Sequence, residues 1–175
     1  MPEAVEVLFS NGCQYYTAGR YAAFAGLNPV VGNILHHAVE HFLKGALSKT
    51  KPLPEPKRLV HNLPAIWAAF KTQAGDPALA QFDDVISTLH EFEELRYPDS
   101  VMASGMQCTI NITKAAAAMT SGTSTVPMPP LYELCLEEID ELVGAIFVAA
   151  SRNPKTYFPT LFKPEVSSIS SETIL

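Results

Sequence analysis

Three of the five histidines in this chain stand close together, at His36, His37 and His41. Glu40 and Lys44 lie among them, and residues three or four apart are neighbours on a helix. These groups fall largely on the side opposite an apolar stripe. Imidazole changes charge near neutral pH, so such a set can transfer protons, bind a metal ion, or form a solvated polar face. This polar set is the first candidate for chemistry.

A metal site is one interpretation of this set. His37 and His41 are four residues apart, so their rings can face one point and hold zinc if a third ligand is supplied. The possible third donors are Glu40, His61 and His90. The sequence fixes none of them, and Ala38 stands where a His-Glu-x-x-His pattern would place its glutamate. We therefore predict no metal and no cofactor, and read the face structurally as an ion pair between Glu40 and Lys44.

Hydrophobic periodicity predicts the helices that position these groups. Apolar residues recur at three- and four-residue steps from Ile34 to Ala46, as a helix buried on one side requires. Similar stripes and start signals predict helices from Pro2 to about Phe24, Asn28 to about Ser48, Asn62 to Gly75, Asp76 to about Arg96, and Glu137 to Ser151. An all-α, up-and-down bundle of about five helices follows.

The pattern changes between the fourth and fifth predicted helices. Residues 106–113, MQCTINIT, alternate strictly between apolar and polar side chains, which is typical of a half-buried strand. The run from Ala115 to Ala118 could add a helical turn, and residues 131–136, LYELCL, could supply a partner strand. We therefore expect a small β-hairpin or an irregular insertion beside the bundle.

Composition restricts the class of protein. The 175 residues predict a single domain over 1–162 and a mobile, serine-rich tail over 163–175. A net charge of −6 works against bulk attraction to nucleic acid. The one dense basic patch comprises Lys49, Lys51, Lys57 and Arg58. Three widely spaced cysteines, Cys13, Cys108 and Cys135, indicate neither a disulfide framework nor a thiolate zinc site. With no leader and no apolar run of membrane length, we expect a cytoplasmic protein.

Four ordered fragments carry a resemblance to a known family. They are YYTAGRYAAFAG, HAVEHFLKGAL, HNLPAIW and HEFEELRYPD, within Met1 to Asp99. This order resembles the HEPN domain, a helical bundle of nucleotide-binding and ribonuclease-like proteins. The resemblance implies a homodimer, for which Tyr15, Tyr16, Tyr21 and Phe24 offer aromatic surface.

Ribonuclease members of that family carry an arginine near the end of a late helix, with a histidine after four to six intervening residues. Arg96 matches the arginine, but no histidine follows it in this chain. Metal-independent RNA cleavage needs a group that moves a proton near neutral pH, and histidine is the usual one. Arg96 is therefore suited to binding a phosphate without an evident catalytic partner; the structural alternative is an ion pair with Glu93.

The resemblance and this gap lead to two functional hypotheses. The first is a HEPN-like protein that binds a nucleotide or RNA phosphate through Arg96, with Tyr97, Lys44 and Arg20, and does not cleave it. The second is a divergent metal-independent ribonuclease, or the toxin of a toxin–antitoxin pair, that uses the polar cluster of His37, Glu40 and His41 and has a nucleotidyltransferase as its partner protein. An interaction module without either activity is the third possibility, and the sequence assigns no catalytic residue.

Overall fold

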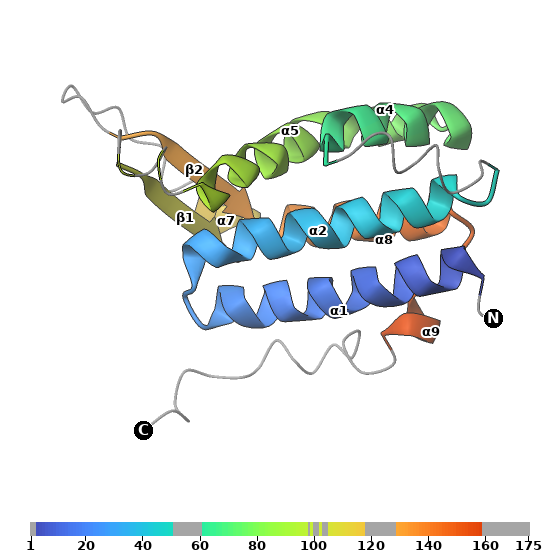
Figure 1. Cartoon of the computed structure of the whole chain (residues 1–175), viewed down its shortest axis with the longest axis horizontal. Helices are drawn as coiled ribbons and strands as arrows, with labels where there is room; N and C mark the ends of the chain where they lie inside the picture. Colours follow the sequence, from blue (N-terminus) through green and yellow to red (C-terminus); the bar gives the residue numbers. More distant parts are fainter. Residues whose placement is uncertain are drawn as a thin grey trace.

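The computed structural model describes residues 3–50, 61–97, 99, 102, 105–117 and 129–158. It is mostly helical, as predicted, with a small sheet at one end (Figure 1). In chain order the elements are α1 (Ala4–Phe24), α2 (Asn28–Leu47), α4 (Leu63–Ala74), the 3-10 helix η1 (Pro77–Phe82), α5 (Asp83–Glu91), the 3-10 helix η2 (Phe92–Arg96), β1 (Gln107–Asn111), α7 (Lys114–Ala117), β2 (Leu131–Cys135), α8 (Leu136–Ala149) and α9 (Pro154–Tyr157).

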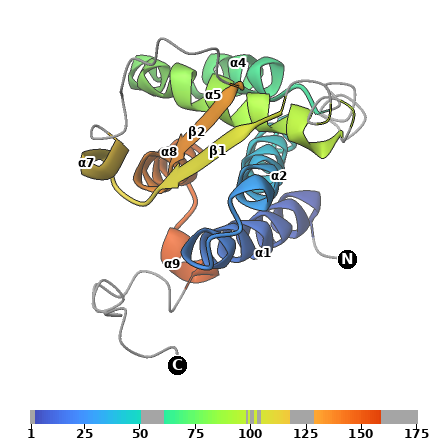
Figure 2. The same ribbon diagram turned by 90° about the vertical axis from the view of Figure 1, so that its left-hand side faces the viewer.

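Helix α2 lies at the centre of the bundle. It packs against α1 on one side and against α4, α5 and η2 on the other, with α8 alongside (Figures 1 and 2). Most of its apolar stripe is buried, and Leu35, Phe42 and Leu43 are fully so. The rings of Phe9, Phe42 and Phe147 meet there, with centroids 5.1 to 5.7 Å apart. The core therefore forms around one face of α2.

Glycines set how closely other elements approach α2. A Cβ at Gly12 of α1 would lie 2.6 Å from the Phe42 ring, and one at Gly32 of α2 would lie 1.9 Å from the Phe92 ring. Real Cβ atoms do not occur at such separations, so both backbones are this near because the side chain is absent. At Gly32 the close approach brings η2 against α2.

The predicted start and stop signals of the third helix are confirmed. The Asn62 side chain accepts a hydrogen bond from the Ala65 amide at 3.0 Å, which caps α4. Gly75 ends this helix with a left-handed φ of 67°. The side chain of Asp76 then accepts from the Ala78 amide at 2.9 Å and begins the next segment.

The fourth predicted helix is divided into three pieces. Residues 77–82 form η1, 83–91 form α5, and 92–96 form η2. Asp83 begins the α-helical part, and its carboxylate accepts hydrogen bonds from Trp67 Nε1 at 2.7 Å and Lys71 Nζ at 2.6 Å. The α-helix gives way to 3-10 geometry in η2, which ends at Arg96, two positions before Pro98 in the sequence.

The expectation of a hairpin is wrong, although a two-stranded insertion does occur between α5 and α8. Strands β1 and β2 pair in parallel, with Gln107 opposite Leu131 and Asn111 opposite Cys135. A hairpin joins antiparallel strands through a short turn, whereas parallel strands need a crossover of a dozen or more residues. Residues 112–130 supply that length and include α7.

Several predictions fall wholly or partly outside the described residues. The tail over 163–175 is among them, as are Lys51, Lys57 and Arg58 of the basic patch. Lys49, the remaining member of that patch, donates a hydrogen bond to the Ala150 carbonyl. None of the described helices combines the length and apolarity that a membrane crossing requires.

Replacing Gly32 with alanine tests the close packing of η2 against α2. We expect Gly32→Ala to lower the free energy of unfolding by about 1–3 kcal/mol, because the Phe92 ring must move. Gly144→Ala is the matched control, since a Cβ on Gly144 of α8 meets nothing within 4 Å. That change should raise the free energy of unfolding by up to about 1 kcal/mol. Urea denaturation measures both, and equal responses would contradict the packing described.

Candidate functional site

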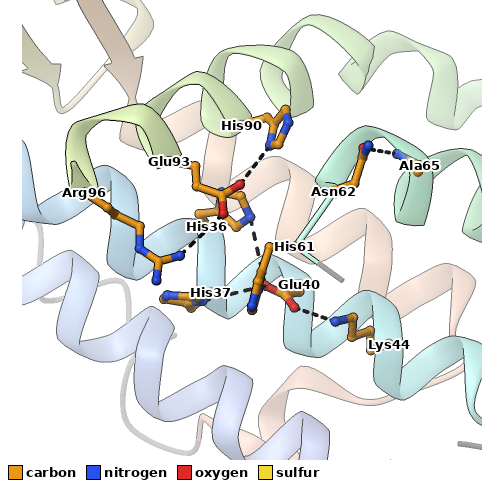
Figure 3. A network of polar contacts seen from close by, with 10 residues as sticks. All are labelled: His36, His37, Glu40, Lys44, His61, Asn62, Ala65, His90, Glu93 and Arg96. Atoms are coloured by element: carbon orange, nitrogen blue, oxygen red, sulfur yellow. Dashed lines mark hydrogen bonds and ion pairs between the residues drawn. The ribbon is translucent and has the colours of Figure 1, made fainter. Parts of the chain in front are cut away.

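All five histidines of the chain lie on or against α2, and Figure 3 shows four of them, His36, His37, His61 and His90. Three belong to α2, His61 precedes α4, and His90 lies in α5. The ring centroids of His36 are 5.9 Å from His37 and 5.7 Å from His90, and those of His37 and His61 are 6.0 Å apart. We call these five residues, together with Glu40 and Glu93, the histidine cluster.

Tyr15 of α1 connects the fifth ring to the others. Its ring stacks on His41, with centroids 5.3 Å apart, and lies 5.7 Å from His37. Burial lowers the pKa of His41, although the Glu40 charge acts in the opposite direction. The spacing of four residues suggested that His37 and His41 could face one point. The structure instead pairs His41 with Tyr15 and His37 with Glu40 and His61.

The Glu40 carboxylate is the buried acidic centre of the cluster. Lys44 Nζ donates to Oε1 at 2.6 Å, and His61 Nδ1 donates to Oε2 at 3.0 Å. His37 Nδ1 lies 3.6 Å from the same Oε2. Burial alone would raise the pKa of Glu40, but the contacts with His37, Lys44 and His61 outweigh it and hold the pKa well below its usual range. The carboxylate is therefore ionised at neutral pH.

His36 is the most enclosed imidazole, with a relative exposure of 3%. Burial lowers its pKa to about 4, against the opposing charges of Glu93 and Glu40. Its Nε2 lies 4.0 Å from Glu40 Oε2, beyond hydrogen-bond distance. Within the described part of the chain neither ring nitrogen of His36 has a hydrogen-bond partner. The ring is therefore neutral and, in those residues, unsatisfied.

Glu93 of η2 joins the cluster from the opposite side and divides its two oxygens between two partners. His90 Nδ1 lies 3.6 Å from Oε2, and Arg96 Nη1 lies 3.4 Å from Oε1. The guanidinium of Arg96 lies at the edge of the cluster, with 38% of its side chain exposed (Figure 3). The structural alternative for Arg96, a pair with Glu93, is thus present as a long contact that leaves the guanidinium accessible.

The other residues predicted for a site divide into two groups. His37 and Glu40 belong to the cluster and Lys44 contacts Glu40, while Tyr97 follows Arg96 with an exposed ring. Arg20 is engaged elsewhere, because its guanidinium pairs with Asp140 of α8. The sequence hypothesis named Arg20 as a further phosphate-binding cation, but its partner is 120 positions away and local pattern does not reveal it.

The aromatic surface proposed for a dimer is present only in part. Tyr21 and Phe24 are exposed and Tyr15 is partly exposed, but Tyr16 is buried at 3% exposure. The Tyr16 hydroxyl donates to Asp140, and its ring packs on Phe158. Tyr16 therefore joins α1 to α8, and its inclusion in the surface was wrong.

The grouping of His36, His90 and Glu93 was not anticipated from the sequence. His90 and Glu93 are three residues apart, so they share one side of their helical segment. That spacing was the available signal, but it does not show that this side meets His36. Only the packing of η2 on α2 at Gly32 brings the three together.

No match to this chain was found among models of protein families, curated proteins or solved structures. Its function is inferred below from the geometry of the histidine cluster.

The lowered pKa of His36 predicts how stability depends on pH. The unfolded ring has its ordinary pKa of 6.5 and the folded ring about 4, so the unfolded chain binds the proton more readily. The stabilisation is complete above pH 6.5 and declines by up to about 3 kcal/mol as the pH falls toward 4. The His36→Gln variant lacks this contribution. As the pH is lowered from neutral toward 4, the free energy of unfolding of this variant should therefore fall less than that of the wild type.

Glu40 and His41 are present in both proteins, so the difference between the two curves isolates His36. Chemical denaturation at a series of pH values provides the measurement. Parallel curves for wild type and His36→Gln would contradict the assignment of a buried, neutral imidazole.

Proposed function

We propose that this protein binds the phosphate of a nucleotide or of RNA at the exposed edge of the histidine cluster, without cleaving it. The accessible guanidinium of Arg96 carries the proposal. Its one ion pair among the described residues is the 3.4 Å contact with Glu93. A guanidinium has five N–H donors in a planar arrangement, so most remain for a bidentate contact with phosphate oxygens.

The surroundings of Arg96 support a ligand that carries both phosphate and a base. His37 and His61 are partly exposed, and each adds positive charge when protonated. The Tyr97 ring is exposed next to Arg96 in the chain and offers a face for a base to stack on. Lys44 contributes charge but is held by Glu40 at 2.6 Å, and Glu93 opposes an anion. We therefore expect moderate, salt-sensitive binding that depends on Arg96.

The proposal includes membership of the HEPN-like helical bundles and a homodimer. Support for the dimer is an apolar surface where α1 ends and α2 begins, formed by Tyr21, Phe24, Leu27 and Val30. A second copy would cover these side chains. Sedimentation velocity would then give about twice the 19.0 kDa chain mass, and Phe24→Ser would shift the protein toward monomer.

One observation favours cleavage as a second candidate function. His37 and His61 both face Glu40 Oε2, at 3.6 and 3.0 Å, and both reach the surface. Two imidazoles beside a carboxylate can act as general base and general acid without a metal ion. This is the ribonuclease or toxin hypothesis with His61 in place of His41, and a nucleotidyltransferase would be its partner protein.

A single RNA experiment separates the two candidates. A labelled single-stranded RNA is titrated with the protein in excess chelator, followed by fluorescence anisotropy. Arg96→Ala should weaken binding about tenfold or more, because a charge-assisted contact contributes about 1.5–3 kcal/mol. Arg96→Lys should recover part of it. Lys155→Ala is the control, since it removes the same charge from an exposed position on α9.

The recovered RNA then distinguishes binding from catalysis. Intact RNA supports the binding function. Cleavage that disappears in both His37→Ala and His61→Ala would establish the second candidate instead. No interaction of the wild type with RNA or mononucleotides, or equal binding by Arg96→Ala and wild type, would overturn the phosphate proposal.

A further inference from the structure

We propose that His36, His90 and Glu93 form a binding site for a divalent transition-metal ion, for which Zn²⁺ is the best fit. One ligand atom from each side chain lies within 4.8 Å of the other two. The donors come from α2, α5 and η2, three elements that the packing at Gly32 holds together. Figure 3 shows the three side chains directed toward one another. Two imidazoles and a carboxylate are a donor set that zinc uses in proteins.

Unsatisfied buried nitrogens provide independent support. His36 is more than nine-tenths buried, and neither of its ring nitrogens has a hydrogen-bond partner among the described residues. The same holds for His90 Nδ1. Buried polar atoms nearly always have a partner, and leaving one without costs about 1–3 kcal/mol. A metal ion would engage one nitrogen of each ring.

The distances agree with ligands around a common ion better than with hydrogen bonds. His90 Nδ1 and Glu93 Oε2 are 3.6 Å apart, too far for a hydrogen bond. Tetrahedral zinc with bonds of about 2.0–2.1 Å places neighbouring donor atoms about 3.3 Å apart. The His90–Glu93 separation is close to that value. Since no separation in the group exceeds 4.8 Å, each pair of ligand atoms would need to approach by at most about 1.5 Å to reach it.

The charges and neighbours of the three donors also suit a cation. A metal ligand must be a neutral imidazole, and the lowered pKa of His36 keeps its ring neutral. Glu93 offers Oε2 to the site while Oε1 faces Arg96 at 3.4 Å. Glu40 lies 4.0 Å from His36 Nε2 and supplies a nearby negative charge. The negative charges of Glu93 and Glu40 both favour a cation at this point.

The neighbouring group of His37, Glu40 and His61 fits a metal less well. Its ligand atoms also lie within 4.8 Å of one another. However, Lys44 Nζ contacts the Glu40 carboxylate at 2.6 Å, closer than the 3.4 Å between Arg96 and Glu93, so a dication bound there would meet the stronger opposing charge. The hydrogen bond from His61 to Glu40 at 3.0 Å already satisfies this pair. We therefore assign the metal to the group on the α5 side.

Three protein donors would leave one coordination position for water or an anion. The metal inference does not depend on phosphate binding, because the RNA experiment above is performed in chelator. Either proposal can therefore fail without the other.

The test is a zinc titration of the full chain after removal of any affinity tag and of bound metal. Isothermal calorimetry should show one equivalent of Zn²⁺ bound by the wild type, and Co²⁺ should give a visible absorption spectrum. His90→Gln and Glu93→Gln should each weaken binding tenfold or more, because each removes a ligand. His61→Gln is the matched control from the neighbouring group and should bind zinc as the wild type does.

Circular dichroism verifies that the variants retain their helices, and the partial exposure of His90 and Glu93 favours this. Absence of saturable zinc binding by the folded wild type would overturn the site. So would zinc affinity that is unchanged in His90→Gln and Glu93→Gln. Loss of affinity in His61→Gln alone would transfer the ion to the other group and equally reject the assignment.

Discussion

A buried carboxylate on the central helix is the constraint on which the histidine cluster depends. Glu40 is 5% exposed, and an ionised carboxylate so far from water is unstable unless donors surround it. Lys44 supplies one donor from the next turn of α2, and His61 supplies another from the residues that lead into α4. The need to satisfy one charge therefore links two parts of the chain and brings the imidazoles together.

The apolar side of α2 makes this arrangement possible. Leu35, Phe42 and Leu43 are fully buried in the core, so the polar side of the same helix is held in a fixed orientation. Gly32 allows Phe92 to approach the backbone, which brings Glu93 and Arg96 to the cluster. Solvent exposure therefore increases across the cluster, from the enclosed His36 to the exposed Arg96. The enclosed end suits a metal ion and the exposed end suits an anionic ligand.

Local pattern was sufficient to predict the helices and their ends. Asn62 and Gly75 act through their own neighbours, as does the ion pair between Glu40 and Lys44, so sequence spacing identifies them. The direction of β2 was not predictable in this way. Alternation identifies a strand, but its direction depends on the path of residues 112–130.

Local sequence pattern was also insufficient to predict which side chains meet in the site. Spacing along α2 brings His37 and His41 to one side, but Tyr15 of α1 takes the His41 ring. Arg20 was predicted to bind phosphate, yet Asp140 of α8 holds it. The meeting of His36 with His90 and Glu93 depends on how η2 packs, which no local feature specifies. The sequence could identify such side chains as candidates for a site, but it could not predict which residue of another element each one contacts.

The pKa of the Glu40 carboxyl group tests the central claim most directly. The chemical shift of its side-chain carboxyl carbon can be followed by NMR as the folded protein is acidified. If the donors from Lys44, His61 and His37 outweigh burial, the carboxyl stays ionised well below its ordinary pKa of 4.5. Protonation at or above 4.5, which burial without these donors would produce, would contradict the account.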